Sequence, residues 1–284
     1  MKLEQFIRKE QQNALSLGKE ESAVVIYLMH ILNYSSSELF LHMSDKVTPF
    51  VLEKFEKEFS LYLYENKPIQ YIVGYQTFYG YDFLVDDRVL IPRFETEELV
   101  ENILKLYDEY FDGQKVKVCD IGTGSGAIGI TLAKEEPNMD VCITDISFDA
   151  LEVAKANNSR LNANVTILQG DMVKPLYGMK FDIIVSNPPY IPDSEEVQSL
   201  VVDNEPNIAL FGGNDGLKFY RIIIEDAKKI AKEKFVMGFE HGYDKNEAIE
   251  ALIKKEFPNA KVIHKKDMQG KNRMTFAIVG DFDE

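Results

Sequence analysis

A glycine-rich turn between an apolar strand pattern and an apolar helix pattern constrains the fold of this 284-residue chain more than any other segment. Residues 116–120 predict a strand, and residues 127–134 predict the opening of a helix. The residues between them, Gly122-Thr123-Gly124-Ser125-Gly126, predict a tight turn. A strand that runs through such a turn into a helix is typical of sheets in which strands and helices alternate.

The chain after this turn continues the alternation. Strands are expected near 141–144, 165–168, 183–186, 235–239, 262–264 and 274–279, and helices near 150–160, 217–232 and 245–257. This order predicts a mostly parallel sheet covered on both faces. The last two strands are joined only by a short polar stretch around 269–272, so the final strand is predicted to be antiparallel.

The glycine turn also indicates a nucleotide or nucleoside ligand. Gly122-x-Gly124-x-x-Ala127 fits the dinucleotide-binding pattern, and Asp145 follows at about the distance expected of an acid that binds ribose. The turn by itself leaves NAD and S-adenosylmethionine open. Asp120 precedes the glycines and places an anion near a cofactor that carries an ammonium and a sulfonium, which favours S-adenosylmethionine.

A second polar motif, Asn187-Pro188-Pro189-Tyr190, follows a short β-branched run. Two consecutive prolines must end the strand there, at a carboxyl edge where open α/β sheets bind ligands. The Asn187 side chain offers a carbonyl acceptor in a reproducible direction, because the residue before a proline is held extended. The motif therefore predicts a grip on a planar NH2 group, either a side-chain amide or an adenine amine. A proline-rich turn after a core strand is the structural alternative.

The amino-terminal part of the chain shows helical periodicity instead of alternation. Ser35-x-x-Glu38 resembles a capping box, and Thr48-Pro49 resembles an N-cap followed by proline at the first helical position. We predict a helical bundle over 1–73 that docks the substrate, a β-hairpin linker over 74–92, and a catalytic domain over 93–284. Thr96 is predicted to start a helix whose hydroxyl and first N–H groups bind the cofactor carboxylate.

Charge and composition limit the partners. The chain has 47 acidic and 32 basic residues and a formal net charge of -15, which disfavours a nucleic-acid substrate and favours a protein. No apolar stretch approaches a membrane span, and the first residues are too polar for a signal peptide, so a cytoplasmic location is expected. Cys119 and Cys142 are expected to be buried thiols, and the four histidines lack metal-ligand spacing, so no metal site is expected.

Taken together, segments in order along nearly the whole chain resemble the HemK/PrmC family. Members of this family are protein-glutamine N5-methyltransferases that act on peptide chain release factors. The segments are Pro68-Ile69-Gln70-Tyr71-Ile72-x-Gly74, Ile91-Pro92-Arg93-x-Glu95-Thr96-Glu97, the run from Asp120 to Ile128, Ser186 to Ile191, and Glu205-Pro206-x-x-Ala209-Leu210. The resemblance implies the class I S-adenosylmethionine-dependent methyltransferase fold, with a seven-stranded sheet.

The resemblance also implies a reaction and a set of site residues. The side-chain amide of the glutamine in a release factor's Gly-Gly-Gln loop would receive a methyl group from S-adenosylmethionine. Asn187, Pro188, Pro189 and Tyr190 would hold that glutamine, with Asn187 Oδ1 and the Pro188 carbonyl as the catalytic acceptors and no general base. The expected cofactor-binding residues are Thr96, Gly122, Thr123, Gly124, Ser125, Gly126, Asp145, Asp171, Met172 and Asn187.

The chain departs from the family pattern at Met172 and Asn204, where an aromatic residue is common, and Met172 bears on cofactor affinity. A ribosomal-protein glutamine methyltransferase is the nearest alternative function. An adenine-N6 nucleic-acid methyltransferase shares the Asn-Pro-Pro-Tyr motif, and a catalytically silent binding protein is a third alternative. We expect a monomer.

Overall fold

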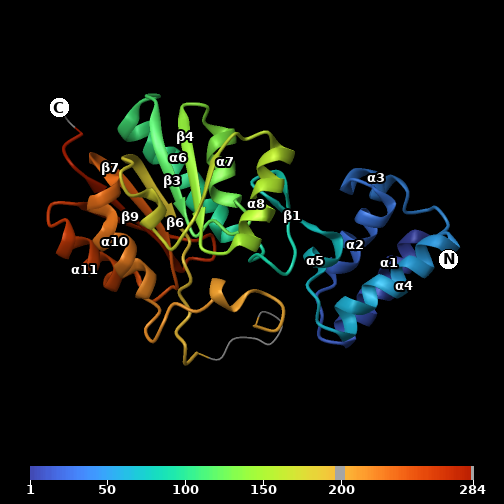
Figure 1. The fold of residues 1–284 in the computed structure, drawn as a ribbon. Helices are drawn as coiled ribbons and strands as arrows, with labels where there is room; N and C mark the ends of the chain where they lie inside the picture. Colours follow the sequence, from blue (N-terminus) through green and yellow to red (C-terminus); the bar gives the residue numbers. More distant parts are fainter. Residues whose placement is uncertain (196–201, 283–284) are drawn as a thin grey trace. The chain divides into compact units, whose positions relative to one another are not determined.

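The structure is a computed structural model that describes residues 1–195 and 202–282. Its largest element is a seven-stranded sheet with the order β5-β4-β3-β6-β7-β9-β8 (Figure 1). The strands are β3 (Val116–Ile121), β4 (Met139–Asp145), β5 (Thr166–Gln169), β6 (Phe181–Ser186), β7 (Ala231–Glu240), β8 (Lys261–Lys266) and β9 (Asn272–Val279). Neighbouring strands are parallel except that β9 runs antiparallel to β7 and to β8. The predicted sheet and its antiparallel last strand are therefore confirmed.

Helices cover both faces of this sheet, as the alternating sequence requires (Figure 1). One face packs against α6 (Phe94–Phe111), α7 (Ala127–Glu135) and α8 (Phe148–Leu161), and the other against α10 (Lys218–Ile230) and α11 (Asn246–Glu256). Successive side chains of a strand point to opposite faces. Val118 of β3 accordingly lies in one apolar cluster and Cys119 in the other.

The two cysteines lie side by side, because Cys119 of β3 is in register with Cys142 of β4. Both are free, buried thiols, which confirms the expectation from the sequence. Burial raises the pKa of each thiol above its ordinary value. They therefore behave as small apolar side chains of the core.

A short hairpin precedes α6. Its strands β1 (Tyr75–Phe78) and β2 (Tyr81–Leu84) form a separate two-stranded sheet joined by Tyr79-Gly80. Both turn residues have positive φ angles, 51° and 80°, as a tight two-residue hairpin turn requires. Phe78 and Phe83 are buried in the same apolar cluster as α6 and α7, so the hairpin predicted as a linker packs into the core of the larger unit.

The amino-terminal residues form a compact helical unit of their own. It contains α1 (Leu3–Ser16), α2 (Ser22–Leu32), α3 (Ser36–Leu41), α4 (Pro49–Tyr64) and α5 (Ile69–Val73), which share an apolar core of their own. Ser35 and Glu38 form the predicted capping box at α3. The Thr48 hydroxyl accepts the Val51 N–H at the start of α4, as predicted.

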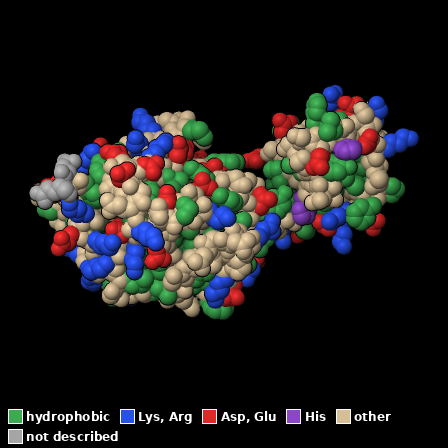
Figure 2. Space-filling model, turned by 90° about the horizontal axis from the view of Figure 1, so that it is seen from above, with side chains coloured by type: hydrophobic (Ala, Val, Ile, Leu, Met, Phe, Trp, Pro, Cys, Tyr) green, Lys and Arg blue, Asp and Glu red, His purple; other side chains and the backbone are tan. Residues whose placement is uncertain are grey.

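The larger unit spans Gln76–Val197 and Glu205–Glu284. Acidic and basic side chains are intermixed over the face of it that Figure 2 shows. Within residues 1–195 and 202–282, no helix is both long and apolar enough to cross a membrane. Because β3, β4, β6 and β7 are parallel, their carboxyl ends meet at one edge, which brings the glycine turn, Asp145, Asn187 and Glu240 together.

Candidate active site

The glycine turn after β3 opens toward a cavity. Gly122 and Gly124 have φ angles of +73° and +56°, and a Cβ atom built on either would meet no atom within 4 Å. The side of the turn that lacks Cβ atoms therefore faces open space, which suits a loop whose backbone approaches a ligand closely. The Gly124 N–H donates to Asp145 Oδ2 at 2.9 Å, which ties the turn to the end of β4.

Asp120 supports this turn through hydrogen bonds to residues within and after it. Its Oδ2 accepts hydrogen bonds from the Thr123 hydroxyl and, at 3.0 Å, from the Gly129 N–H. The side chain is fully buried, burial raises its pKa to about 7, and Oδ1 has no hydrogen-bond partner. Asp120 is not among the residues that line the cavity, so its carboxylate supports the loop and does not form the cavity wall.

Asp145 holds its carboxylate at the cavity wall through two backbone donors. Oδ2 accepts from Gly124 and Oδ1 accepts from the Ser147 N–H at 2.9 Å. Burial raises the pKa of the Asp145 carboxyl, and these backbone bonds oppose the rise. Because each carboxylate oxygen has a further lone pair, Asp145 can also accept from two neighbouring hydroxyl groups of a ribose.

Asp171 and Met172 line the cavity after β5, as expected. Met172 has a φ angle of +49°, an uncommon left-handed conformation for a residue with a Cβ atom, and its side chain is buried. Asp171 forms an ion pair with Lys174 at 2.6 Å. The sequence pattern gave no indication of the left-handed backbone at Met172.

The Asn-Pro-Pro-Tyr turn follows β6 directly. Asn187 and Pro189 line the cavity, whereas Pro188 and Tyr190 do not. The Asn187 Nδ2 donates to the Thr96 hydroxyl at 3.2 Å. Within the described residues no hydrogen bond engages Asn187 Oδ1 or the Pro188 carbonyl oxygen, so both acceptors are available. Burial raises the pKa of the Tyr190 phenol to about 12, so Tyr190 is neutral at physiological pH.

The position of Thr96 differs from the prediction. Helix α6 begins at Phe94, with Arg93 as its N-cap, so Thr96 is the third residue of the helix. Its hydroxyl donates to Glu240 Oε2 at 2.6 Å and accepts from Asn187. The hydroxyl is thus engaged within the protein and not free for an anion, although Thr96 does line the cavity.

Glu240, at the carboxyl end of β7, was not predicted from the sequence. It is 2% exposed, and burial raises its pKa to about 7. Asn187 was recognised because it is a polar residue directly after an apolar strand pattern. The same signal is present at Glu240, which follows the apolar residues 235–239.

Glu205 holds one wall of the cavity in place. Its side chain is 3% exposed, accepts the Ile91 N–H at 3.1 Å, and forms an ion pair with Arg93. These contacts join the segment before α6 to residues 206–209, three of which line the cavity. Glu205-Pro206 is part of a segment that resembles the HemK/PrmC family. The sequence did not indicate, however, that the Glu205 side chain would be buried and hydrogen-bonded to other segments.

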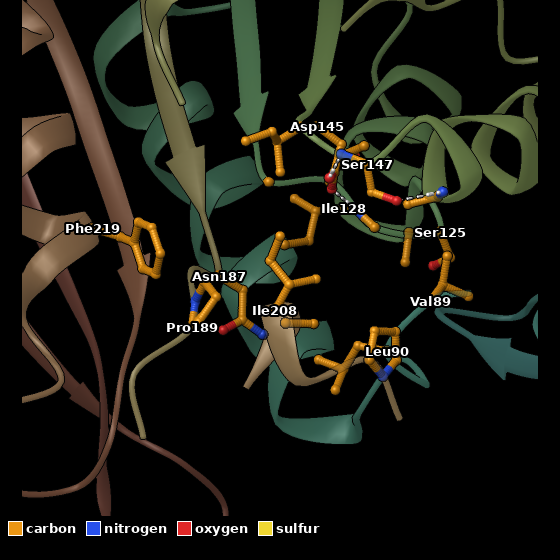
Figure 3. A pocket seen from close by; sticks show the side chains of 18 of the residues that line it. Val89, Leu90, Ser125, Ile128, Asp145, Ser147, Asn187, Pro189, Ile208 and Phe219 are labelled. Atoms are coloured by element: carbon orange, nitrogen blue, oxygen red, sulfur yellow. Dashed lines mark hydrogen bonds between the residues drawn. The ribbon is translucent and has the colours of Figure 1, made fainter. Parts of the chain in front are cut away.

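The cavity has a volume of about 350 Å³, within the range of small-molecule sites. In Figure 3, Asp145 and Ser147 lie on one side of it, Asn187 and Pro189 on another, and Ile128 and Ile208 between them. All of the predicted cofactor-binding residues line it except Gly126, whose added Cβ would lie 2.6 Å from Ile130. An open glycine turn, a carboxylate acceptor and an apolar middle fit a nucleoside with an amino-acid tail.

Comparisons with known proteins identify the family. The methyltransferase small domain family matches residues 96–204, and the PrmC N-terminal domain family matches residues 10–74. A release factor glutamine methyltransferase from Bacillus cereus is 42% identical over 267 residues, which are 92% of this chain and 93% of that protein. The chain belongs to the release factor glutamine methyltransferase family.

Other relatives support the same assignment. A release factor glutamine methyltransferase from Streptococcus pneumoniae is 38% identical over 96% of this chain and 97% of its own length. A crystal structure of a methyltransferase from Pyrococcus furiosus superimposes with a TM-score of 0.51 and 20% identity, over 72% of this chain and 91% of the other. That likeness concerns the fold alone. The family and the fold imply use of S-adenosylmethionine.

Proposed function

We propose that this protein transfers a methyl group from S-adenosylmethionine to the side-chain amide nitrogen of the glutamine in the Gly-Gly-Gln loop of peptide chain release factors. The observation that carries the proposal is the pair of available acceptors on the Asn-Pro-Pro-Tyr turn, of which Asn187 and Pro189 line a cavity that suits the cofactor. Membership of the release factor glutamine methyltransferase family supports the choice of substrate.

The proposed cofactor contacts follow from the cavity. The turn from Gly122 to Gly126 would hold the methionine part, Asp145 the ribose hydroxyls, and Asp171 and Met172 the adenine. When bound, S-adenosylmethionine supplies a methyl group on a positively charged sulfur. Thr96 and Asn187 also line the cavity.

The chemistry asked of the protein is the activation of a poor nucleophile. Resonance delocalises the nitrogen lone pair of an amide, so the site must orient the nitrogen and favour the lone pair on it. Asn187 Oδ1 and the Pro188 carbonyl would each accept one N–H of the target amide, and Tyr190 would pack on its plane. Orientation of this kind can supply about 7–11 kcal/mol in favourable cases. No general base is needed before attack, because the methylated amide cation loses its proton readily.

The test is methylation of a purified release factor, read as peptide masses around the Gly-Gly-Gln loop. A gain of one methyl group on that peptide is expected, and a release factor whose loop glutamine is replaced by alanine should gain none. Methylation of a ribosomal protein or of nucleic acid, with no gain on the release factor, would refute the substrate assignment. Asn187→Ala is expected to abolish most transfer while calorimetry still detects cofactor binding.

The remaining proposals concern the setting of the reaction. The helical unit formed by α1 to α5 would dock the release factor, because none of its described residues lines the cavity. A role in translation would place the protein in the cytoplasm, and we propose that it acts as a monomer. Loss of methylation on removal of residues 1–75, with cofactor binding retained, is the expected result for docking.

A further inference from the structure

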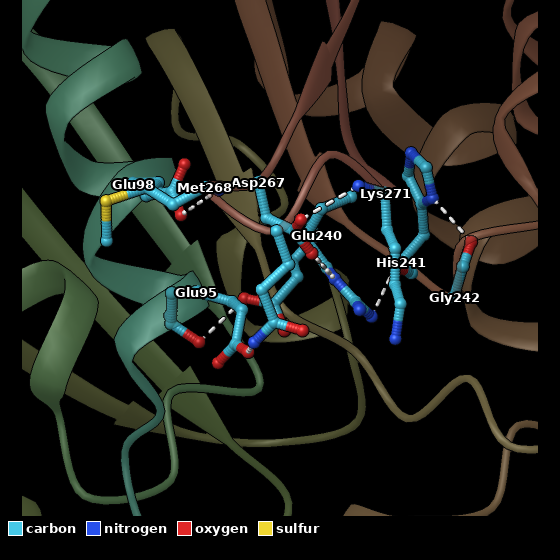
Figure 4. A network of polar contacts seen from close by, with 11 residues as sticks. Glu95, Glu98, Glu240, His241, Gly242, Asp267, Met268 and Lys271 are labelled. Atoms are coloured by element: carbon cyan, nitrogen blue, oxygen red, sulfur yellow. Dashed lines mark hydrogen bonds and ion pairs between the residues drawn. The ribbon is translucent and has the colours of Figure 1, made fainter.

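Glu240 is a buried acid that the proposed mechanism does not use. It ends β7, its carboxyl group accepts from the cavity-lining Thr96, and only 2% of the residue is exposed. Figure 4 shows it in the middle of a polar network that includes Glu95 and Asp267. A buried carboxyl group next to the substrate acceptors calls for an explanation, because burying an acid is costly unless it serves a structural or functional purpose.

A chain of two hydrogen bonds connects Glu240 to the NH2 end of the Asn187 side chain, opposite the proposed substrate acceptor Oδ1. The Thr96 hydroxyl lies 2.6 Å from Glu240 Oε2, and Asn187 Nδ2 lies 3.2 Å from the same hydroxyl oxygen. Thr96 is itself buried, so water does not readily replace either bond. The three side chains come from β7, α6 and the turn after β6, which are held together by the packing of the sheet.

The direction of these bonds follows from the chemistry of the first group. A carboxylate can only accept, so an ionised Glu240 obliges the Thr96 hydroxyl to donate its single proton to it. The hydroxyl oxygen is then left to accept, and the group of Asn187 that faces it must be the NH2. Because the two ends of a carboxamide are opposite in polarity, Asn187 Oδ1 then faces the cavity as an acceptor.

A protonated Glu240 loses this control. The acid can donate to the Thr96 oxygen, and the hydroxyl can then donate to Asn187, which turns the carboxamide around. The NH2 of Asn187 would then face the target amide. An NH2 group cannot accept a hydrogen bond from the N–H of that amide. Both directions become available, so the acceptor that the reaction needs is presented for only part of the time.

We propose that Glu240 is a positioning residue that sets the polarity of the Asn187 side chain, both directly and through the Thr96 hydroxyl, and that its ionisation switches the site into its accepting form. This inference rests on the proposed function, because the target amide is what requires an acceptor. It assigns Glu240 no contact with the substrate.

Other charged and titratable groups around Glu240 bear on its ionisation. Hydrogen bonds from the Thr96 and Asn187 side chains and the charge of Arg273 from β9 lower the pKa of Glu240, whereas the charge of Glu95 from α6 raises it. Tyr190 after β6 is neutral at physiological pH. Tyr220 from α10 donates to the backbone carbonyl of Glu240 and not to its carboxyl group. Burial is the largest influence and raises the pKa of Glu240 to about 7. The switch therefore falls within the physiological range.

The first test is the pH profile of kcat with saturating cofactor and release factor. The wild-type rate should fall about 5- to 10-fold as the pH decreases through the titration of Glu240, because a charge-assisted bond is replaced by a neutral one. Glu240→Gln should give a flat profile near the wild-type acid value. Thr96→Val should weaken the pH dependence, because only the direct contact between Glu240 and Asn187 remains, and Thr96→Ser should retain it. The double variant Glu240→Gln/Thr96→Val should be about as slow as Glu240→Gln. Glu101→Gln, on the exposed face of α6, is the matched control.

The second test reads the switch without turnover. The Asn187 side-chain NH2 signal in a nitrogen–proton NMR spectrum, assigned by its loss in Asn187→Ala, should shift with pH at the kinetic midpoint. The shift should be absent in Glu240→Gln and unchanged in Glu101→Gln. An Asn187 signal that ignores pH, or a Glu240→Gln enzyme that keeps the wild-type pH profile, would overturn the relay. Failure to methylate the release factor at any pH would instead overturn the proposed function, and the NMR result would still decide the relay.

Discussion

Replacement of Gly212 by alanine tests how closely the Asn-Pro-Pro-Tyr turn is held. A Cβ atom at Gly212 would lie 2.5 Å from the Pro189 carbonyl oxygen and 2.9 Å from the Tyr190 Cα, both of them backbone atoms. The Gly212 N–H also donates to the Ile191 carbonyl at 2.8 Å, which holds the two segments together. The new methyl group therefore cannot be accommodated by rotation of a side chain.

The expected displacement is small but falls at the reacting centre. Real Cβ contacts are at least 3.0 Å and ordinarily 3.4 Å or more, so the turn must move by about 0.5 to 0.9 Å. A shift of about 1 Å in a positioned group can cost about 100-fold in rate, so we expect kcat to fall about 10- to 100-fold. Overpacking should lower the free energy of unfolding by about 1–3 kcal/mol.

Gly242→Ala is the matched control, because Gly242 also lies beside Tyr190. Its added Cβ would meet Asp244, Lys245 and Tyr190 at 3.4 to 3.6 Å, which is ordinary contact. The assay compares kcat on a release factor, cofactor affinity by calorimetry, and urea unfolding for both variants. Cofactor affinity should change little in either, since the glycine turn is untouched. A Gly212→Ala enzyme whose kcat stays within about twofold of Gly242→Ala would refute the reasoning.

Further predictions concern stability and cofactor binding. Thr48→Ala should lower the unfolding free energy of the helical unit by about 1 kcal/mol in urea, because the first turn of α4 loses its cap; no change would contradict this. Glu205→Ala should cost about 1–3 kcal/mol and weaken cofactor binding, measured by calorimetry, because Ile91 and Arg93 lose their shared partner; unaltered affinity would speak against its role in the wall. Burial raises the pKa of Asp120 and of Glu240 to about 7, above the values of unfolded acids. The stability from these two groups is fully present below about pH 4 and is lost as the pH rises from there through about 7, so Asp120→Asn should flatten the fall in melting temperature between about pH 4 and 7.

Much of the fold could be predicted because the signals were local. The strand at β3, the helix at α8 and the caps at Ser35 and Thr48 each depend on residues within one turn or one strand of each other. The antiparallel last strand followed from the short polar connection around 269–272, which leaves no room for a crossover helix. The cap of α6 was placed three residues late, because Thr96 has the side chain of a typical N-cap, whereas Arg93 occupies that position.

The candidate site divides in the same way. The glycine turn, Asp145 and Asn187 could be predicted because each lies directly after a strand pattern, and parallel strands bring their carboxyl ends to one edge. Glu205 and Glu240 could not be assigned roles, because the partners of a buried acid come from other elements. Met172 was expected in the cavity, but its left-handed backbone is imposed by the surrounding structure.

By itself the sequence determined the alternation of elements, the positions of the ligand-binding turns and the chemical groups available in them. Only the tertiary structure decided how those groups act on one another. Asn187 and Glu240 lie 91 and 144 residues after Thr96 in the sequence, yet the three side chains form one hydrogen-bonded chain. Periodicity reports which face of an element is buried, whereas the direction of a hydrogen bond depends on the partner that folding brings to it. The polarity of Asn187 is therefore a property of the folded chain.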